Sequence, residues 1–295
     1  MYDWLSHQVA KISPQHARMM AWHAVRLASL IFTAKVPESL QREVMGLKFP
    51  GPVGMAAGFD KHGELYSALT KIGLGFVEIG SVIPEPEHMR SNGLEAVANN
   101  LMRYSRPYPV PLGISLSMNR KTPFEQMPED YLAGMRRLWK IADYFVLNLG
   151  VRAGPDLHLS ENRETLHKVL SAAKCEQLKL FYKYGLSRPL VVKVDQHRGD
   201  TTSLLCCIKD FGFDGVILSG ENNQDKHRMA LMTLERTVNL LDSIPVISVG
   251  GIRTPQDAAD HLSAGASLIQ IYSGLVASGP MLPQRMNSYL LNRLH

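Results

Sequence analysis

Apolar residues recur along the chain in short runs that are rich in β-branched side chains. Most of these runs are separated by segments with helical periodicity, such as Tyr131–Ile141 and Pro255–Ala264. Alternating buried strands and helices predict a parallel sheet, and a count of eight runs favours a closed (β/α)8 TIM barrel. The eight runs are Val53–Ala57, Gly75–Ser81, Leu112–Leu116, Tyr144–Leu149, Leu190–Val194, Gly215–Leu218, Val246–Val249 and Ser267–Ile271.

The segment before the first strand has a different pattern, which divides the chain into residues 1–40 and a barrel of residues 41–295. Ser13 followed by Pro14 predicts a helix start, and apolar residues continue to about Phe32. With residues 1–12, this predicts a short N-terminal helical pair. Two arrangements stay open: packing on the barrel, or a monotopic contact with the inner face of the cell membrane that admits a lipophilic molecule.

Composition narrows the class of protein. With 295 residues and 45% hydrophobic content the chain can bury one large core, and no apolar run is long enough to span a bilayer. The net charge of +5 is scattered, which does not favour a nucleic-acid partner. Three cysteines without a C-x-x-C pair predict a reducing, cytoplasmic setting and no metal site, with Cys206 and Cys207 as buried residues on a helix.

Two successive strands end in glycine in the stretch SVGGIRTPQDAADHLSAGASLIQIYSG. One strand runs into Gly250 and Gly251, and the next runs into Tyr272, Ser273 and Gly274. A glycine at a strand end lets the backbone approach a ligand, and its amide can point at an anion. The two adjacent ends therefore predict a cradle for a phosphate group.

Other predicted strand ends complete this picture. The small residues of Ala56–Gly58 would let a flat ring lie on the backbone, and Lys61 follows as an anion partner. Lys193 ends a buried strand, where a cation needs an anionic neighbour. That neighbour is either the N1–C2=O edge of a reduced flavin or a carboxylate of Asp195 or Glu78. The pattern suits a mononucleotide with its phosphate on strands seven and eight and its ring over strands one to five.

The motifs MAAGFDKHGELYSAL, FVEIGSVIP, SMNRKTPFEQMPEDYLAGM, VGGI and AGASLIQIYSG resemble the quinone-linked class 2 dihydroorotate dehydrogenases. The resemblance implies an FMN-binding barrel in which electrons pass from dihydroorotate, the family's small-molecule substrate, to FMN and then to a quinone, ubiquinone, bound under the N-terminal helices. It also implies substrate-binding and catalytic roles for Lys61 and Asn148. The implied FMN contacts are Ala56, Ala57, Gly58, Ser81, Ser115, Asn148, Lys193, Ser219, Gly250, Gly251, Tyr272, Ser273 and Gly274.

The chain departs from the family pattern where the family binds its substrate. The family's Asn-x-Ser-Ser-Pro-Asn stretch is replaced by NLGVRAGPDL, which places Val151 at the position of the serine base and Ala153 at that of an orotate-binding asparagine. The family's Thr-Asn pair is Ser219-Gly220, and its other substrate segments are reduced to Met89–Val97 and Glu221–Met229. Valine cannot accept a proton, so the family mechanism is not expected to run unchanged.

Three functions therefore stay open. The protein is an FMN-dependent oxidoreductase acting on a small molecule other than dihydroorotate, a dihydroorotate dehydrogenase with a substituted base, or a non-catalytic flavin-binding homologue. His62 and His158 could replace the base, or be solvated loop histidines. Arg152 suits anion binding, and Glu95 could stand where the family has an amide, which would favour a cationic or neutral substrate.

Overall fold

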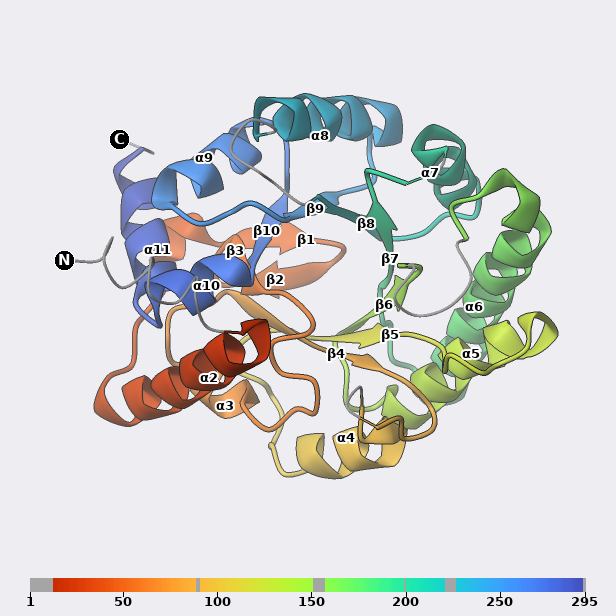
Figure 1. Ribbon diagram of the computed structural model, residues 1–295, viewed down its shortest axis with the longest axis horizontal. Helices are drawn as coiled ribbons and strands as arrows, with labels where there is room; N and C mark the ends of the chain where they lie inside the picture. The colour runs from red at the N-terminus through yellow and green to blue at the C-terminus, as the bar shows by residue number, and fades with distance from the viewer. Residues whose placement is uncertain (1–12, 89–90, 151–156, 199, 221–226, 294–295) are drawn as a thin grey trace.

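The eight predicted strands form a closed parallel barrel (Figure 1). The structure is a computed structural model, and it describes residues 13–88, 91–150, 157–198, 200–220 and 227–293. The order around the barrel is β10-β3-β4-β5-β6-β7-β8-β9, so the last strand closes on the first. The strands are β3 (Val53–Met55), β4 (Phe76–Val82), β5 (Leu112–Leu116), β6 (Tyr144–Asn148), β7 (Leu190–Asp195), β8 (Gly215–Ser219), β9 (Val246–Val249) and β10 (Leu268–Ile271). The predicted fold is confirmed, and each strand boundary lies within two residues of its predicted place.

Helices surround the barrel and bury its outer face (Figure 1). The α-helices are α2 (Pro14–Ile31), α3 (Tyr66–Leu69), α4 (Gly93–Leu101), α5 (Met127–Leu138), α6 (Arg163–Tyr184), α7 (Thr201–Asp210), α8 (His227–Leu241), α9 (Pro255–Ser263), α10 (Ser273–Ser278) and α11 (Leu282–Asn292). Short 3-10 turns lie at η1 (Glu38–Leu40), η2 (Phe124–Gln126) and η4 (Ser160–Asn162). The two helical segments that the periodicity predicts correspond to α5 and α9.

A short hairpin whose buried side chains are apolar closes the barrel at the amino-terminal ends of the strands. Strands β1 (Arg42–Val44) and β2 (Leu47–Phe49) pair antiparallel, and Phe49 is fully buried. Its ring meets that of Phe76, at the start of β4, edge to face at 5.4 Å. Aromatic and aliphatic side chains therefore fill this end of the barrel, which leaves the carboxyl-terminal ends for a site.

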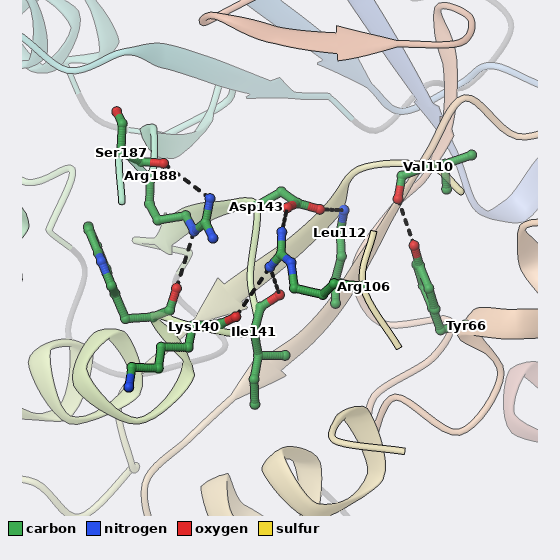
Figure 2. Close-up of polar contacts among 10 residues, drawn as sticks. Tyr66, Arg106, Val110, Leu112, Lys140, Ile141, Asp143, Ser187 and Arg188 are labelled. Carbon is green, nitrogen blue, oxygen red and sulfur yellow. Dashed lines mark hydrogen bonds and ion pairs between the residues drawn. The ribbon is translucent and has the colours of Figure 1, made fainter. Parts of the chain in front are cut away.

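Polar contacts fix the loops that enter β5 and β6 at the same amino-terminal end (Figure 2). The carboxylate of Asp143 accepts the Leu112 backbone N–H at 2.9 Å and pairs with the guanidinium of Arg106. Arg106 also donates to the carbonyl oxygens of Lys140 and Ile141, at 3.2 and 3.0 Å. These contacts fix the register of β5 and β6 at their start, and the same register sets which residues are neighbours at their carboxyl-terminal ends.

Helix α2 begins where the sequence predicts, with the Ser13 hydroxyl accepting the His16 N–H. One side of the helix is buried through small residues and Val25 and contacts α3 and α10, as Figure 1 shows. The opposite side exposes Leu27, Leu30 and Ile31, the last two by 81% and 74%. The first helix of the predicted pair falls in residues 1–12, outside the described residues. In the described part of the chain, no helix is long and apolar enough to cross a bilayer.

The cysteine prediction is wrong in part. Cys206 and Cys207 lie on helix α7 as expected, but Cys206 is exposed and Cys207 is only half-buried. The helix turns Leu204, Leu205 and Ile208 toward the sheet, and this places position 206 on the solvent side.

Candidate active site at the carboxyl-terminal ends of the strands

Three polar side chains from adjacent strands form a hydrogen-bonded chain at the carboxyl-terminal ends. The Asn148 amide donates to the Ser81 hydroxyl at 2.8 Å, and this hydroxyl lies 3.3 Å from that of Ser115. The other side of the Asn148 amide accepts the Gly150 N–H at 3.1 Å. The structure therefore brings together three predicted cofactor contacts from β4, β5 and β6, with the Asn148 side chain locked in one orientation.

Lys193 lies beside these three hydrogen-bonded side chains, because β6 and β7 pair Asn148 with Lys193. Of its two alternative carboxylate partners, Asp195 pairs with Arg198 at 3.5 Å. Glu78 is fully buried inside the barrel and accepts a hydrogen bond from Gln270 at 2.6 Å. Burial raises the pKa of Glu78, and the charge of Lys193 is the largest opposing cause. Lys193 therefore acts on Glu78 through its charge, and in the described part of the chain no ion pair joins the two.

The paired strand ends form a tight backbone cradle. A Cβ at Gly250, which has a φ of +114°, would lie 1.5 Å from the Gly220 carbonyl oxygen, so this position requires glycine. A Cβ at Gly274 would lie 2.5 Å from the Ile252 carbonyl oxygen. Ser273 and Gly274 open helix α10, where the first amides have no acceptor within the helix. Glycine at 250 and 274 thus allows the ends of β9 and β10 to lie close to neighbouring backbone.

The small residues after β3 extend this surface across the point where the barrel closes. The Ala56 N–H donates to the Ile271 carbonyl at 3.1 Å, and the Gly58 N–H donates to Gly80 at 2.6 Å. Gly58 has a φ of +100°, and a Cβ there would lie 3.5 Å from the Tyr272 ring. The predicted ring platform and the predicted phosphate cradle are therefore neighbours.

Lys61 lies on a loop that a buried carboxylate shapes. The Asp60 side chain, 2% exposed, accepts the backbone N–H groups of four residues, at 2.8 to 3.3 Å. Burial raises the pKa of Asp60, and these four donors oppose the rise. Sequence reasoning missed this residue, although an aspartate side chain in a loop often accepts hydrogen bonds from the backbone N–H groups that follow it. The donors are those of His62, Gly63, Glu64 and Leu65.

A cavity of about 140 Å³ separates this loop from helix α2. Arg18, Met19 and Trp22 line it from the helix, and Phe59–His62 and Glu64 line it from the loop. Lys61 therefore borders both the strand ends and a chamber under the N-terminal helix.

The candidate bases lie in different places from those expected. His62 lines the chamber under α2, and burial lowers the pKa of its imidazole. His158 is 3% exposed, so it is not a solvated loop histidine, and its Nε2 accepts the Asp195 N–H at 3.2 Å. The positions Val151, Arg152 and Ala153 lie outside the described residues.

The Glu95 hypothesis is wrong. Glu95 lies on α4, where its exposed carboxylate pairs with Arg137 of α5 at 2.8 Å. This guanidinium lowers the pKa of Glu95. The residue belongs to the outer helical layer, where α4 packs beside α5.

These features define the class of protein as a (β/α)8 barrel with a site at the carboxyl-terminal strand ends. The sequence profile of the family described as "Dihydroorotate dehydrogenase" matches residues 39–89 and 216–294. A relative from Nitrosospira multiformis, "Dihydroorotate dehydrogenase (quinone)", is 30% identical over 99% of this chain and 96% of its own length. One of the same name from Idiomarina loihiensis is 33% identical over 91% of this chain and 92% of its own. The chain therefore belongs to the dihydroorotate dehydrogenase family.

Solved structures agree on the fold. Ligand-free dihydroorotate dehydrogenase of Eimeria tenella superposes with a TM-score of 0.83 and 25% identity over 96% of this chain and 95% of that one. Its complex with ferulenol gives a TM-score of 0.82 at 24% identity, over 97% and 94% of the two chains.

A buried histidine supports the cradle from behind. The Nδ1 atom of His261, on α9, lies 2.8 Å from the Ser248 hydroxyl, two residues before Gly250. The ring is 3% exposed and borders a small cavity of about 10 Å³ beside Gly220 and Gly250. Burial lowers the pKa of His261 from 6.5 to about 4, with the nearby His227 as the second cause.

This shift predicts a pH-dependent loss of stability. The unfolded chain takes up a proton on His261 as the pH falls through 6.5, whereas the folded protein does so only near 4. Stability is therefore present above 6.5 and falls toward 4, by about 2 kcal/mol at pH 5. Urea unfolding at pH 7 and pH 5 measures the loss, which we expect to be reduced in His261→Gln and kept in His23→Gln, a change at an exposed position. An equal loss in all three proteins would contradict the assignment.

Proposed function

We propose that the protein is an FMN-dependent oxidoreductase. The observation that carries this proposal is the glycine cradle at β9 and β10, where side chains are excluded and the first amides of α10 have no helical acceptor. An anion such as a phosphate fits such donors. The polar chain of Ser81, Ser115 and Asn148 and the cation of Lys193 lie at the other strand ends, where the ring of a mononucleotide would face them.

Different residues would hold the phosphate and the ring of FMN. Gly250, Gly251, Tyr272, Ser273 and Gly274 would hold the phosphate. The strand ends of β3 to β8 would hold the ring and the chain that links it to the phosphate, through Ala56, Ala57, Gly58, Ser81, Ser115, Asn148, Lys193 and Ser219. When bound, FMN supplies the ability to accept a hydride or two electrons.

The chain's own groups then set charge and orientation. Lys193, half-buried beside Asn148, offers a fixed positive charge to the edge of the ring that gains negative charge on reduction. Lys61, on the loop shaped by Asp60, offers a second cation to an anionic group of a substrate. Hydrogen bonds to Ser81 and Gly150 hold the Asn148 amide in one orientation, so it would present the same groups to the ring.

The acceptor side of the reaction is proposed to be a quinone. The cavity of about 140 Å³ between α2 and the Phe59–Glu64 loop has an apolar part, formed by Met19, Trp22 and Phe59, beside charged side chains that include Arg18. The relatives from Nitrosospira multiformis and Idiomarina loihiensis carry "quinone" in their names, which supports this acceptor.

The substrate is proposed to differ from dihydroorotate. The family profile does not match residues 90–215, the part that carries Val151 and Ala153 in place of the serine base and an orotate-binding asparagine. General-base catalysis contributes on the order of 10² to 10⁴ in rate, which valine cannot supply. His158 is buried, and its Nε2 accepts the Asp195 N–H at 3.2 Å.

A second candidate is a dihydroorotate dehydrogenase with a substituted base. It is favoured by two relatives of that name at 30% and 33% identity over most of the chain. The two candidates share the fold, the FMN and the quinone, and they differ in one half-reaction, the transfer of electrons from dihydroorotate to the bound flavin.

The flavin proposal predicts that the purified protein is yellow and releases FMN on denaturation. We expect Gly250→Ala to lose FMN, because the added Cβ would collide with the Gly220 carbonyl. Gly185→Ala is the control: this glycine also has a positive φ, but a Cβ there meets nothing within 4 Å. Flavin absorbance after gel filtration measures the bound FMN, with circular dichroism to confirm folding. A colourless parent protein that also fails to take up added FMN would refute the proposal.

The exposed apolar side of α2 is proposed to contact the membrane that carries the quinone. Removing two apolar side chains from an interface costs about 1.5–3 kcal/mol for each. We therefore expect Leu30→Ser with Ile31→Ser to weaken binding to phosphatidylethanolamine–phosphatidylglycerol vesicles at least tenfold. Leu178→Ser, at an exposed leucine of α6, is the matched control and should bind like the parent. Equal co-sedimentation of all three proteins would count against a membrane role for α2.

A further inference from the structure

A cavity of about 330 Å³ lies on the amino-terminal side of the barrel, away from the carboxyl-terminal strand ends. It is bounded by Arg42 of β1, by Pro52 just before β3, and by the helices α9 and α11, which pack side by side (Figure 1). Small-molecule sites in proteins have volumes of about 300 Å³ and more, so this cavity is large enough for a ligand. None of the residues that line it takes part in the proposed flavin or quinone sites.

Most of the residues that line this cavity are apolar. They come from η1, from the segment before β3, and from the facing sides of α9 and α11. Burying apolar surface of a ligand against such a wall is favourable, because it removes both surfaces from water. The apolar lining residues are Leu40, Pro52, Ala259, Leu262 and Leu290.

Two arginine side chains give the cavity its charge. Arg42 and Arg293 both line it and both are exposed. In the part of the chain that the structure describes, neither forms an ion pair with a carboxylate, and the residues that line the cavity include no aspartate or glutamate. Two cations that border one cavity without a carboxylate attract an anion.

The carboxyl-terminal ends of α9 and α11 act in the opposite direction. Ser263, the last residue of α9, lines the cavity, and Arg293 is the C-cap residue of α11. Each helix end carries about half of a negative charge. Two such ends offset about one of the two positive charges of the guanidinium groups, so a net positive charge is left for an anion.

Both arginines are held near the cavity by their surroundings. The guanidinium of Arg293 lies 5.7 Å from the centre of the Tyr289 ring, and the Tyr289 hydroxyl is hydrogen-bonded to Gln256 of α9. The backbone of Arg42 pairs with that of Phe49, whose side chain is fully buried. Less freedom is then lost when a ligand binds.

We propose that this cavity binds a small carboxylate with an apolar tail, of the kind that a medium-chain fatty acid provides. Arg42 and Arg293 would bind the carboxylate, because a guanidinium group matches its two oxygens with two parallel hydrogen bonds. The tail would cover the apolar side chains of η1, α9 and α11. This site is independent of the proposed flavin, which would lie at the opposite ends of the strands.

The experiment is titration calorimetry of the full chain with decanoate, kept below the concentration at which it forms micelles. We expect saturable binding to the parent protein. Arg42→Gln and Arg293→Gln should each weaken it by about tenfold, because each change removes a hydrogen-bonded charge from the carboxylate. Arg236→Gln, at an exposed arginine of α8 that does not line the cavity, is the matched control and should bind like the parent.

Two further comparisons separate binding in the cavity from binding elsewhere on the surface. Ser263→Phe changes no charge but places a large side chain in the cavity, and it should abolish measurable binding. Decyltrimethylammonium, which has an equally long apolar chain and a positive head group, should not bind to the parent.

Three outcomes would overturn the inference. The first is a parent protein that does not bind decanoate, and the second is equal binding by the parent and both arginine variants. The third is loss of binding in the arginine variants with unchanged binding in Ser263→Phe, because the anion would then lie outside the cavity.

Discussion

Barrel closure between β10 and β3 is the constraint on which the site depends. The register of Ile271 opposite Met55 places the residues after the first strand beside those after the last. As a result the Ala56 N–H reaches the Ile271 carbonyl, and Gly58 faces the ring of Tyr272. A small-residue platform and a glycine cradle, encoded some 200 residues apart in the chain, thereby become one surface.

The sequence predicted the barrel well because its strands are short apolar runs whose burial dictates their residue types. Glycine at 250 could be interpreted for a similar reason, since backbone contact leaves no room for a Cβ. Side-chain partners were harder to predict. Cys206 is exposed because it lies on the solvent side of its helix. Glu95 pairs with Arg137 of the neighbouring helix, and His158 is buried against β7. None of these three depends on local sequence alone.

The two ends of the proposed site are built differently, one from backbone and the other from side chains. The proposed phosphate end consists of backbone, so it tolerates few changes and its glycines can be identified from the sequence. The substrate end consists of side chains on loops, where replacement changes chemistry without disturbing the barrel. In the proposed site, Asn148, Lys193 and Lys61 would supply the amide and charges that face the ring, and Val151 would stand where the family has its proton acceptor. Membership of the family therefore fixes the fold and the reaction class more firmly than the substrate.

The most direct test of this account is anaerobic mixing of the FMN-loaded protein with dihydroorotate, followed by flavin absorbance. We expect the flavin to stay oxidised over minutes, because Val151 cannot accept the proton that must leave the substrate, while dithionite bleaches the same sample. Rapid bleaching by dihydroorotate would contradict the account and establish the second candidate, a dihydroorotate dehydrogenase that uses another base.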